Sequence, residues 1–196
     1  MLCKRNFAID ENFSAPSLQA HPPPTLAPIC RMAESWKIKL LRWRFNRYPA
    51  YRQSGARVVR ISEDFREITV RLPLNRLTRN LHGTLYGGAM YSAVDPLHAV
   101  IVAYHLGPDF HVWMKSAKID FKRPGRSDLF AHARLSQHEL DEIRHALARE
   151  PKIDRVFKVN LADAHGEVAA HCELTVHIKR RGRHEPAMND LVFAKS

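Results

Sequence analysis

Three glycines and one aspartate give residues 80–95, NLHGTLYGGAMYSAVD, a composition suited to a site that handles negative charge. Gly83, Gly87 and Gly88 lie where the chain must turn and begin a helix, so backbone N–H groups can be left free for a ligand. Such a helix start attracts anions, because its N–H groups are unsatisfied and the helix dipole is positive there. The loop is therefore a candidate anion-binding element.

Asp95 is the only carboxylate of the helix that follows, and it interrupts an apolar pattern. One helical face carries apolar side chains at spacings of three and four: Met90, Val94, Leu97, Ile101 and Tyr104. A second stripe adjoins that face and contains Tyr91, Asp95, His98, Val102 and His105. We therefore expect Asp95 to be partly desolvated. Pro96 should kink the helix beside it.

Each of these features also has a purely structural interpretation. Asp95 can cap a broken helical turn or pair with His98 three residues later. The glycines can form a tight connection without a ligand, and Asn80 alone is a typical turn residue. The histidines show no HExxH or comparable ligand spacing, so we assign no metal site.

Length and composition limit the class of protein. The 196 residues, 45% of them hydrophobic, suffice for one ordinary domain with a sizeable core. No apolar run approaches the roughly 20 residues needed to cross a bilayer, and residues 1–9 lack the apolar core of a secretory signal, so we expect a cytoplasmic protein. Cys3, Cys30 and Cys172 are odd in number and have no CxxC spacing, which argues against a disulfide framework and a cysteine-bound metal.

The net charge of +11 and the isoelectric point near 10.0 indicate a surface that attracts polyanions such as nucleic acids, anionic membranes and coenzyme A. The sequence shows neither aromatic and basic residues alternating on one strand nor a helix-turn-helix pattern, so we do not expect a nucleic-acid partner. The basic run KRRGRH at residues 179–184 is expected to be a solvated terminus.

The chain begins with a segment of different composition. Residues 1–33 contain PSLQAHPPPTLAP and no sustained hydrophobic period, so we expect a disordered extension, with Met32 as a candidate start of translation. A helix is predicted over residues 34–47. One of its sides carries Trp36, Leu40, Trp43 and Arg47. We expect this helix to pack on the domain, and the alternative is a helix on a membrane surface.

Strand patterns account for most of the remaining chain. Two strands are predicted at residues 56–61 and 65–72, around a turn. After the long helix, residues 111–122 alternate a more polar set with Trp113, Lys115, Ala117, Ile119 and Phe121. Pro124-Gly125 predicts a hairpin to a second strand at 128–135. A charged helix follows at 137–149, and strands at 155–162 and 167–179 flank the turn DAHG. The domain is expected to span 34–183, with a tail at 184–196.

This order of elements suits an antiparallel sheet wrapped around a central helix, an α+β layout that resembles the hotdog fold. Four segments carry the resemblance: NLHGTLYGG at 80–88, Asp95-Pro96, VWMKSAKIDFKRPGR at 112–126, and AYRQSGARVVRISEDFREITVRLPLN at 50–75. Together they look like a domain-of-unknown-function branch of the hotdog thioesterase superfamily, over roughly Trp36 to Lys179. The asparagine, the glycine pair and the aspartate have the order and spacing of phenylacetyl-CoA-type thioesterases.

The resemblance implies hydrolysis of an acyl thioester of coenzyme A or of an acyl carrier, with no cofactor beyond the coenzyme A of the substrate. Asp95 then acts as general base or nucleophile, the Gly87 and Gly88 amides form an oxyanion site, and Asn80 orients water or substrate. Preorganised N–H donors stabilise the charge that develops on the thioester carbonyl oxygen. Substrate-binding roles are expected for six further residues: Tyr86, His82, Tyr91, Lys115, Lys122 and Arg123.

The distance between the two halves of the site predicts an oligomer. Gly87 and Asp95 are eight residues apart, about 12 Å along a helix that rises 1.5 Å per residue. One carbonyl cannot touch both, so we expect a site across the interface of a homodimer or a dimer of dimers, as the superfamily also suggests.

Tyr86 departs from the family pattern, in which active relatives commonly carry histidine before the glycine pair. Tyrosine, with a pKa of about 10, is a poor general base at neutral pH. Two alternatives to hydrolysis therefore stand beside it. One is a hotdog protein that binds acyl-CoA or an acyl carrier without cleaving the thioester. The other is a dehydratase that uses Asp95 with His98.

Overall fold

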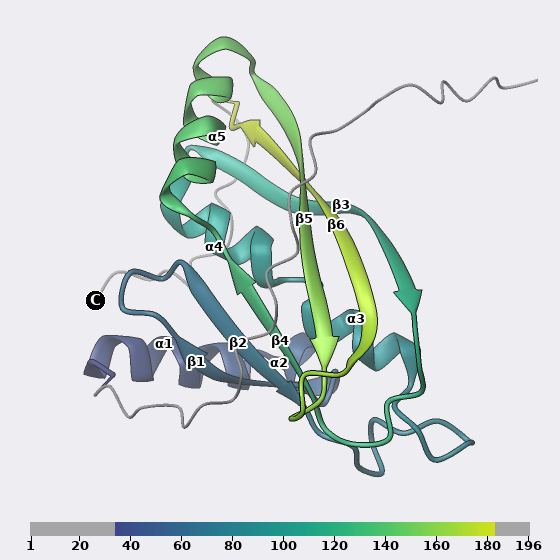
Figure 1. Cartoon of the computed structure of the whole chain (residues 1–196). Helices are drawn as coiled ribbons and strands as arrows, with labels where there is room; N and C mark the ends of the chain where they lie inside the picture. The colour runs from purple at the N-terminus through teal and green to yellow at the C-terminus, as the bar shows by residue number, and fades with distance from the viewer. Residues whose placement is uncertain (1–33, 183–196) are drawn as a thin grey trace, which may run out of the picture.

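A six-stranded antiparallel sheet, in the order β1-β2-β4-β5-β6-β3, is the framework of residues 34–182, the part of the chain that the computed structural model describes (Figure 1). The strands are β1 (Arg57–Ile61), β2 (Glu67–Leu72), β3 (Phe110–Phe121), β4 (Leu129–Arg134), β5 (Lys152–Ala162) and β6 (Val168–Arg180). The helices are α1 (Trp36–Arg47), α2 (Pro49–Gln53), α3 (Gly87–Val94), α4 (Leu97–Leu106) and α5 (Gln137–Arg149). The expected N-terminal extension at 1–33 and the tail at 184–196 lie outside the described residues.

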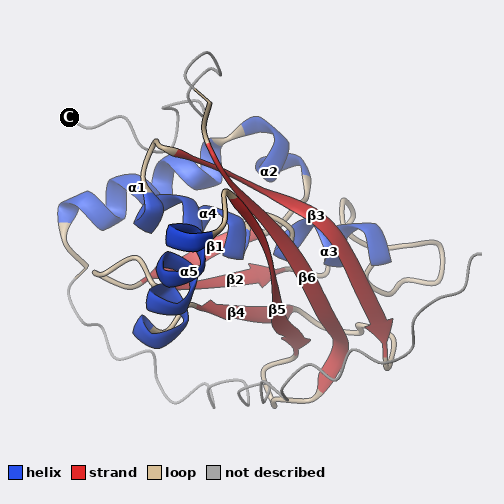
Figure 2. Cartoon of the chain, turned by 90° about the horizontal axis from the view of Figure 1, so that it is seen from above, coloured by secondary structure: helices blue, strands red, loops and turns tan. Residues whose placement is uncertain are grey.

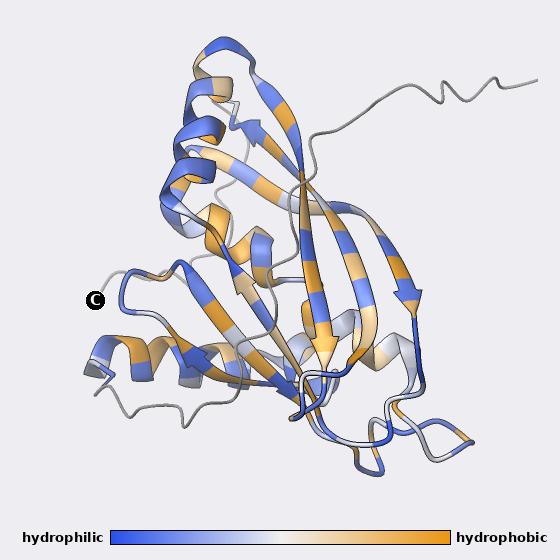
Figure 3. Cartoon of the chain, in the orientation of Figure 1, coloured by the Kyte–Doolittle hydropathy of each residue, from blue (hydrophilic) through white to orange (hydrophobic). Residues whose placement is uncertain are grey.

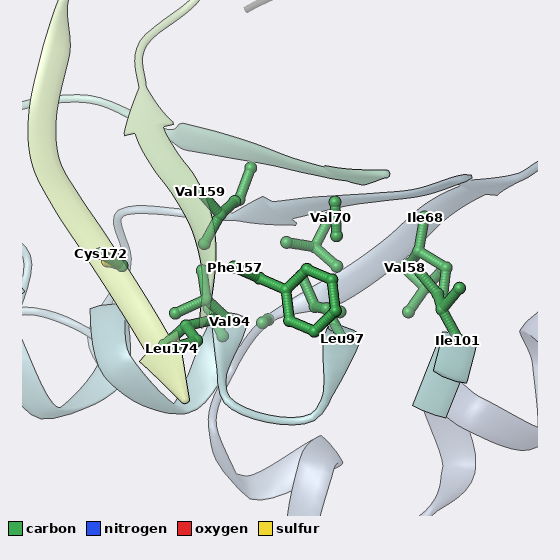
Figure 4. Packing of buried hydrophobic residues seen from close by; sticks show 14 of the residues in the cluster. Val58, Ile68, Val70, Val94, Leu97, Ile101, Phe157, Val159, Cys172 and Leu174 are labelled. Atoms are coloured by element: carbon green, nitrogen blue, oxygen red, sulfur yellow. The ribbon is translucent and has the colours of Figure 1, made fainter. Parts of the chain in front are cut away.

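The sheet curves around α3 and α4, whose apolar side chains fill its concave face (Figures 1 and 2). Hydrophobic and hydrophilic residues alternate along the strands, as Figure 3 shows, because only one face of each strand is buried. In Figure 4, side chains from β1, β2, β5 and β6 meet those of Val94, Leu97 and Ile101 around the ring of Phe157. The expected sheet around a central helix is confirmed.

The central helix is broken at the predicted position. α3 ends at Val94, Asp95 is its C-cap, and α4 begins at Leu97. The Asp95 N–H still donates to the Tyr91 carbonyl at 2.9 Å, but Pro96 has no N–H to continue the pattern. The break therefore leaves Asp95 at the junction of two helical segments.

The expected hairpin between β3 and the next strand is wrong. β3 pairs with β6 at one edge of the sheet, whereas β4 lies between β2 and β5. β4 matches β2 because small and branched residues face each other on the buried side, as in the pair Ala131 and Val70. The Asp128 carboxylate, which accepts from the Leu74 N–H at 2.9 Å, fastens the start of β4 to the end of β2.

β3 also changes face along its length, which corrects the single alternating set predicted there. The register with β6 shifts between Met114 and Ser116. Trp113 therefore lies opposite the half-buried His177 on the outer face, whereas Ile119 and Phe121 lie on the concave face. A β-bulge inserts one extra residue and so reverses the alternation beyond it.

Two residue pairs are all that join β4 to β5, Phe130 with Ala162 and Ala131 with Leu161, within the described residues. Beyond them the strands diverge, and α5 connects their separated ends (Figure 2). α5 spans the residues predicted for it and begins with a capping box between Ser136 and Glu139. It buries apolar residues in the gap between the strands: Leu140, Ile143 and Leu147.

α1 packs on the domain as expected, through Ile38 and Phe45. Its end is held where Asn46 exchanges two hydrogen bonds with the Val58 backbone, at 2.8 and 2.9 Å. The short helix α2, absent from the sequence prediction, places the Tyr51 ring edge-on against Phe45 and its hydroxyl against the Ala93 carbonyl. No helix in residues 34–182 is long and apolar enough to cross a bilayer.

Candidate active site

The loop before α3 is shaped by Asn80. Its Oδ1 accepts from the N–H groups of His82 and Thr84, at 2.9 and 3.2 Å, and its Nδ2 donates to Thr84 Oγ1 at 3.0 Å. These bonds enclose Gly83, whose φ of 77° is a left-handed conformation that glycine adopts without strain. The asparagine amide is thus engaged within its own loop, and the His82 side chain is exposed.

The start of α3 presents a pair of glycines beneath two aromatic rings. The N-cap Tyr86 makes no side-chain capping bond, so the first helical N–H groups, at Gly87 and Gly88, are left to other partners. A Cβ built on Gly87 falls 3.0 Å from the Phe121 ring, and one on Gly88 falls 2.4 Å from the Tyr86 ring. Glycine at position 88 lets the tyrosine fold back over the helix.

Asp95 is half-buried and has one hydrogen-bond partner among the described side chains. The Tyr91 hydroxyl, one turn earlier, donates to Asp95 Oδ1 at 2.7 Å. This hydrogen bond and burial raise the pKa of Tyr91 to about 12, so the tyrosine stays a neutral donor throughout the physiological range. The second carboxylate oxygen accepts no hydrogen bond from the described residues.

The two halves of the candidate site lie at opposite ends of α3. Gly87 is its first residue and Asp95 its C-cap, a rise of about 12 Å at 1.5 Å per residue. A single acyl carbonyl therefore cannot touch both within one chain.

His98 does not join Asp95. It is 2% exposed and stacks on Phe157 with ring centroids 4.5 Å apart. Burial, opposed by a hydrogen bond to the Arg134 backbone, lowers the pKa of His98 to about 4. Its Nδ1 has no partner in the described part of the chain. The pairing of Asp95 with His98 that a dehydratase needs is absent from residues 34–182.

The predicted basic substrate contacts are divided between the outer face of the sheet and the end of β3. Lys115 forms an ion pair with Asp154, whose carboxylate also accepts a hydrogen bond from the outer-face His177 ring. Lys122 and Arg123 follow Phe121 directly, at the end of β3 that covers the start of α3. Lys122 is exposed, whereas Arg123 forms an ion pair with Asp163 at 2.7 Å. Only the latter two lie near the glycine pair.

Sequence reasoning did not identify Phe121 as part of the candidate site. The alternation of β3 placed it on a strand face, but nothing in the sequence showed that this face covers Gly87. A group of three or more histidine, cysteine or acidic side chains arranged for a metal does not occur within residues 34–182.

A family model matches most of the chain. The family is described as a domain of unknown function (DUF4442), and its model covers residues 39–178. No curated protein matches the chain.

Solved structures share the fold at low sequence identity. A Pseudomonas aeruginosa protein of unknown function, described as a probable thioesterase, is 21% identical with a TM-score of 0.64, over 73% of this chain and 95% of that one. A Haemophilus influenzae thioesterase is 15% identical with a TM-score of 0.59, over 78% of this chain and 97% of that one. At these identities the likeness establishes the fold, which is the hotdog fold expected from the sequence.

Proposed function

Because the chain belongs to the DUF4442 family and has the hotdog fold, we propose that it hydrolyses an acyl thioester of coenzyme A or of an acyl carrier. The observation that carries the proposal is the half-buried Asp95 carboxylate at the break between α3 and α4, held by the Tyr91 hydroxyl. Structural neighbours that are named thioesterases support this class of reaction.

In the proposed mechanism Asp95 acts as a general base. Its free oxygen takes a proton from a water molecule, whose oxygen attacks the thioester carbonyl carbon and forms a tetrahedral oxyanion. The carbonyl then re-forms as the carbon–sulfur bond breaks, and the departing thiolate recovers a proton from the carboxyl group. The alternative is direct attack by the carboxylate, which forms an anhydride that water hydrolyses.

The oxyanion is stabilised, in this proposal, by the Gly87 and Gly88 amides of the partner subunit. The length of α3 requires two chains, since about 12 Å separates its ends. N–H groups at a helix start are preorganised for a developing negative charge. The rings of Phe121 and Tyr86 over the glycines limit water there and so strengthen the electrostatic stabilisation.

The thiol portion of the substrate is expected to pass along the end of β3. Lys122 is the exposed cation that follows Phe121, and we assign it to the phosphates of coenzyme A. Asn80, His82 and Tyr86 form the neighbouring rim through the loop that Asn80 shapes. Arg123, already paired with Asp163, orders the β5–β6 turn beside them.

Asp95→Asn tests the base. A panel of acyl-CoA thioesters is assayed by thiol release, and turnover is expected to fall by about 100-fold or more. Asp120→Asn is the matched control, because Asp120 is an exposed carboxylate of β3 opposite His171. Equal turnover by Asp95→Asn and wild type refutes the catalytic role.

Gly87→Pro tests the oxyanion site by removing one backbone N–H group. Gly87 is the first helical position, where proline is well tolerated, and the preceding Tyr86 has an extended ψ of 131°. Proline removes the N–H, whereas Gly87→Ala adds a Cβ against Phe121 and keeps it. We expect about a 100-fold loss of turnover in the proline variant and only a small loss in the alanine variant.

A binding protein that holds an acyl thioester without cleaving it is the second candidate, favoured by Tyr86 in place of a histidine. The Tyr86 side chain is 59% exposed and lies over Gly88. Isothermal titration with acyl-CoA separates the two: saturable binding without thiol release, in wild type and Asp95→Asn alike, supports the binding protein.

A further inference from the structure

The outer side of α1 carries apolar and aromatic side chains that are exposed to solvent. Trp36 is 64% exposed, Leu40 39% and Trp43 56%. They recur every three or four residues and so form one stripe, on the side of the helix opposite the buried Ile38 and Phe45. Figure 1 shows α1 along the outside of the molecule beside β1.

This stripe is surrounded by positive charge. Residues 36–53, WKIKLLRWRFNRYPAYRQ, contain six basic residues and no acidic one. Arg42 is paired with Glu34 at 2.8 Å, but Arg47 and Arg52 have no acidic partner within residues 34–182. Apolar and aromatic side chains flanked by lysine and arginine are typical of surfaces that lie in the interface of an anionic bilayer.

A hollow beside the stripe is suited to a phosphate group. Its volume is about 320 Å³, and it is lined by Arg47, Pro49, Arg52 and Gln53. The Arg47 guanidinium also lies 5.0 Å from the centre of the Trp43 ring, so the hollow and the stripe are continuous. Two guanidinium groups and an amide offer the donors that an anionic headgroup accepts.

We propose that α1 and the adjoining hollow form a docking surface for an anionic phospholipid bilayer. Trp36, Leu40 and Trp43 enter the interface, while Arg47 and Arg52 bind headgroup phosphates. This inference is independent of the thioester reaction, because neither Asp95 nor the glycine pair belongs to the surface. It brings the protein to a membrane as a peripheral protein, held by one side of α1 and by Arg52 of α2.

Vesicle sedimentation of the full chain tests the proposal. We expect binding to vesicles of phosphatidylcholine with phosphatidylglycerol and at least about tenfold weaker partition into phosphatidylcholine alone, because each basic side chain gains affinity from anionic lipid. Trp36→Ala/Trp43→Ala and Arg47→Glu/Arg52→Glu are each expected to lower partition into the mixed vesicles about tenfold or more. Equal binding to both vesicle types overturns the proposal.

A matched charge control distinguishes binding through this surface from attraction by the net charge of the protein. Arg149→Glu/Lys152→Glu makes the same change in charge at two exposed residues, the last of α5 and the first of β5, and its partition is expected to stay within about twofold of wild type. An equal loss in this control overturns the proposal. Thermal melts establish that each variant folds.

Tryptophan fluorescence identifies the part that enters the lipid. The chain has three tryptophans, so Trp113→Phe leaves Trp36 and Trp43 as reporters. Mixed vesicles should shift their emission to the blue, and brominated lipid should quench it. If a second copy of the chain covers this surface instead, vesicles cause no shift of the emission, and Trp36→Ala/Trp43→Ala forms a smaller oligomer than wild type. That result overturns the proposal.

Discussion

The hydrogen bond from Tyr91 to Asp95 fixes the orientation of the carboxylate. Its donor and acceptor lie one helical turn apart, so the bond depends on the end of α3 and not on a distant strand. Because the pKa of Tyr91 is about 12, the hydroxyl stays protonated and donates at neutral pH. Tyr91 is therefore a positioning residue for the proposed base.

Tyr91→Phe is expected to lower turnover of an acyl-CoA substrate about tenfold, because a hydrogen bond to a charged group contributes about 1.5–3 kcal/mol. Tyr48→Phe, at an exposed position, serves as the control. Wild-type turnover by Tyr91→Phe contradicts the role of Tyr91.

His98 occupies the gap where β4 and β5 diverge, bonded to the Arg134 backbone of β4 and stacked on Phe157 of β5. Burial holds its pKa near 4 in the folded chain, against 6.5 for an ordinary histidine. Between these values the unfolded chain binds a proton that the folded chain does not, so stability is lost as the pH falls.

The free energy of unfolding should decrease between about pH 6.5 and about pH 4, with His98 contributing about 3 kcal/mol. Urea unfolding across this range measures the decrease. His98→Leu should have a weaker dependence on pH, and His138→Gln, at an exposed position of α5, should keep that of wild type. Parallel curves for His98→Leu and wild type would show that another group is responsible.

At the scale of elements, the start of α3 couples a glycine to an aromatic ring. Alanine at position 88 places its Cβ 2.4 Å from the Tyr86 ring, although alanine is the better helix former. The ring must leave the helix for the Cβ to fit.

A double-mutant cycle measures this coupling. Gly88→Ala in a Tyr86→Ala background is expected to stabilise the protein by about 0.5–1 kcal/mol, the usual helical preference of alanine over glycine. In the presence of Tyr86 the gain should be cancelled by displacement of the ring. Equal effects of Gly88→Ala in both backgrounds, measured by urea unfolding, rule out the close packing of the two residues.

Local patterns in the sequence predicted most elements because those elements follow from periodicity and turn residues. The helix at 137–149, the strand ending near Ala162 and the break at Pro96 all depend on neighbours in the chain. The pairing of β3 with β6 depends on residues some 60 positions apart, so the local turn at Pro124-Gly125 predicted a hairpin instead.

The candidate site shows the same division between local and distant information. Spacing along one helix identified Asp95, Tyr91 and the glycine pair. The β-bulge beside Lys115 sent that side chain to the outer face, and the contact of Phe121 with Gly87 joins two elements. Neither feature leaves a sequence signal, because both arise when the sheet closes around α3.

At the scale of the whole molecule, a site shared between two chains predicts that two inactive variants regain activity when they form a mixed dimer. In a mixed dimer of Asp95→Asn and Gly87→Pro, one site has both defects and the other has an intact base and an intact N–H donor. Unfolding and refolding an equimolar mixture should therefore recover about one quarter of wild-type turnover, since half of the dimers are mixed.

Each variant refolded alone provides the control, and size-exclusion chromatography with light scattering confirms exchange. If mixed dimers form without any recovered turnover, either Asp95 and Gly87 of the same chain serve one site, or one of the two residues takes no part in the reaction. Either result is incompatible with the proposed arrangement.

Only two residue pairs join β4 to β5 within the described residues, so the sheet has a weak junction there, called the seam below. On one side of the seam, β3, β5 and β6 pair along most of their lengths. On the other side, β1, β2 and β4 form a smaller group. Few ladder hydrogen bonds must break for the seam to part, so the two groups are expected to unfold as separate cooperative units. Slow amide exchange should then persist in β5 and β6 after the protection of β1 and β2 is lost.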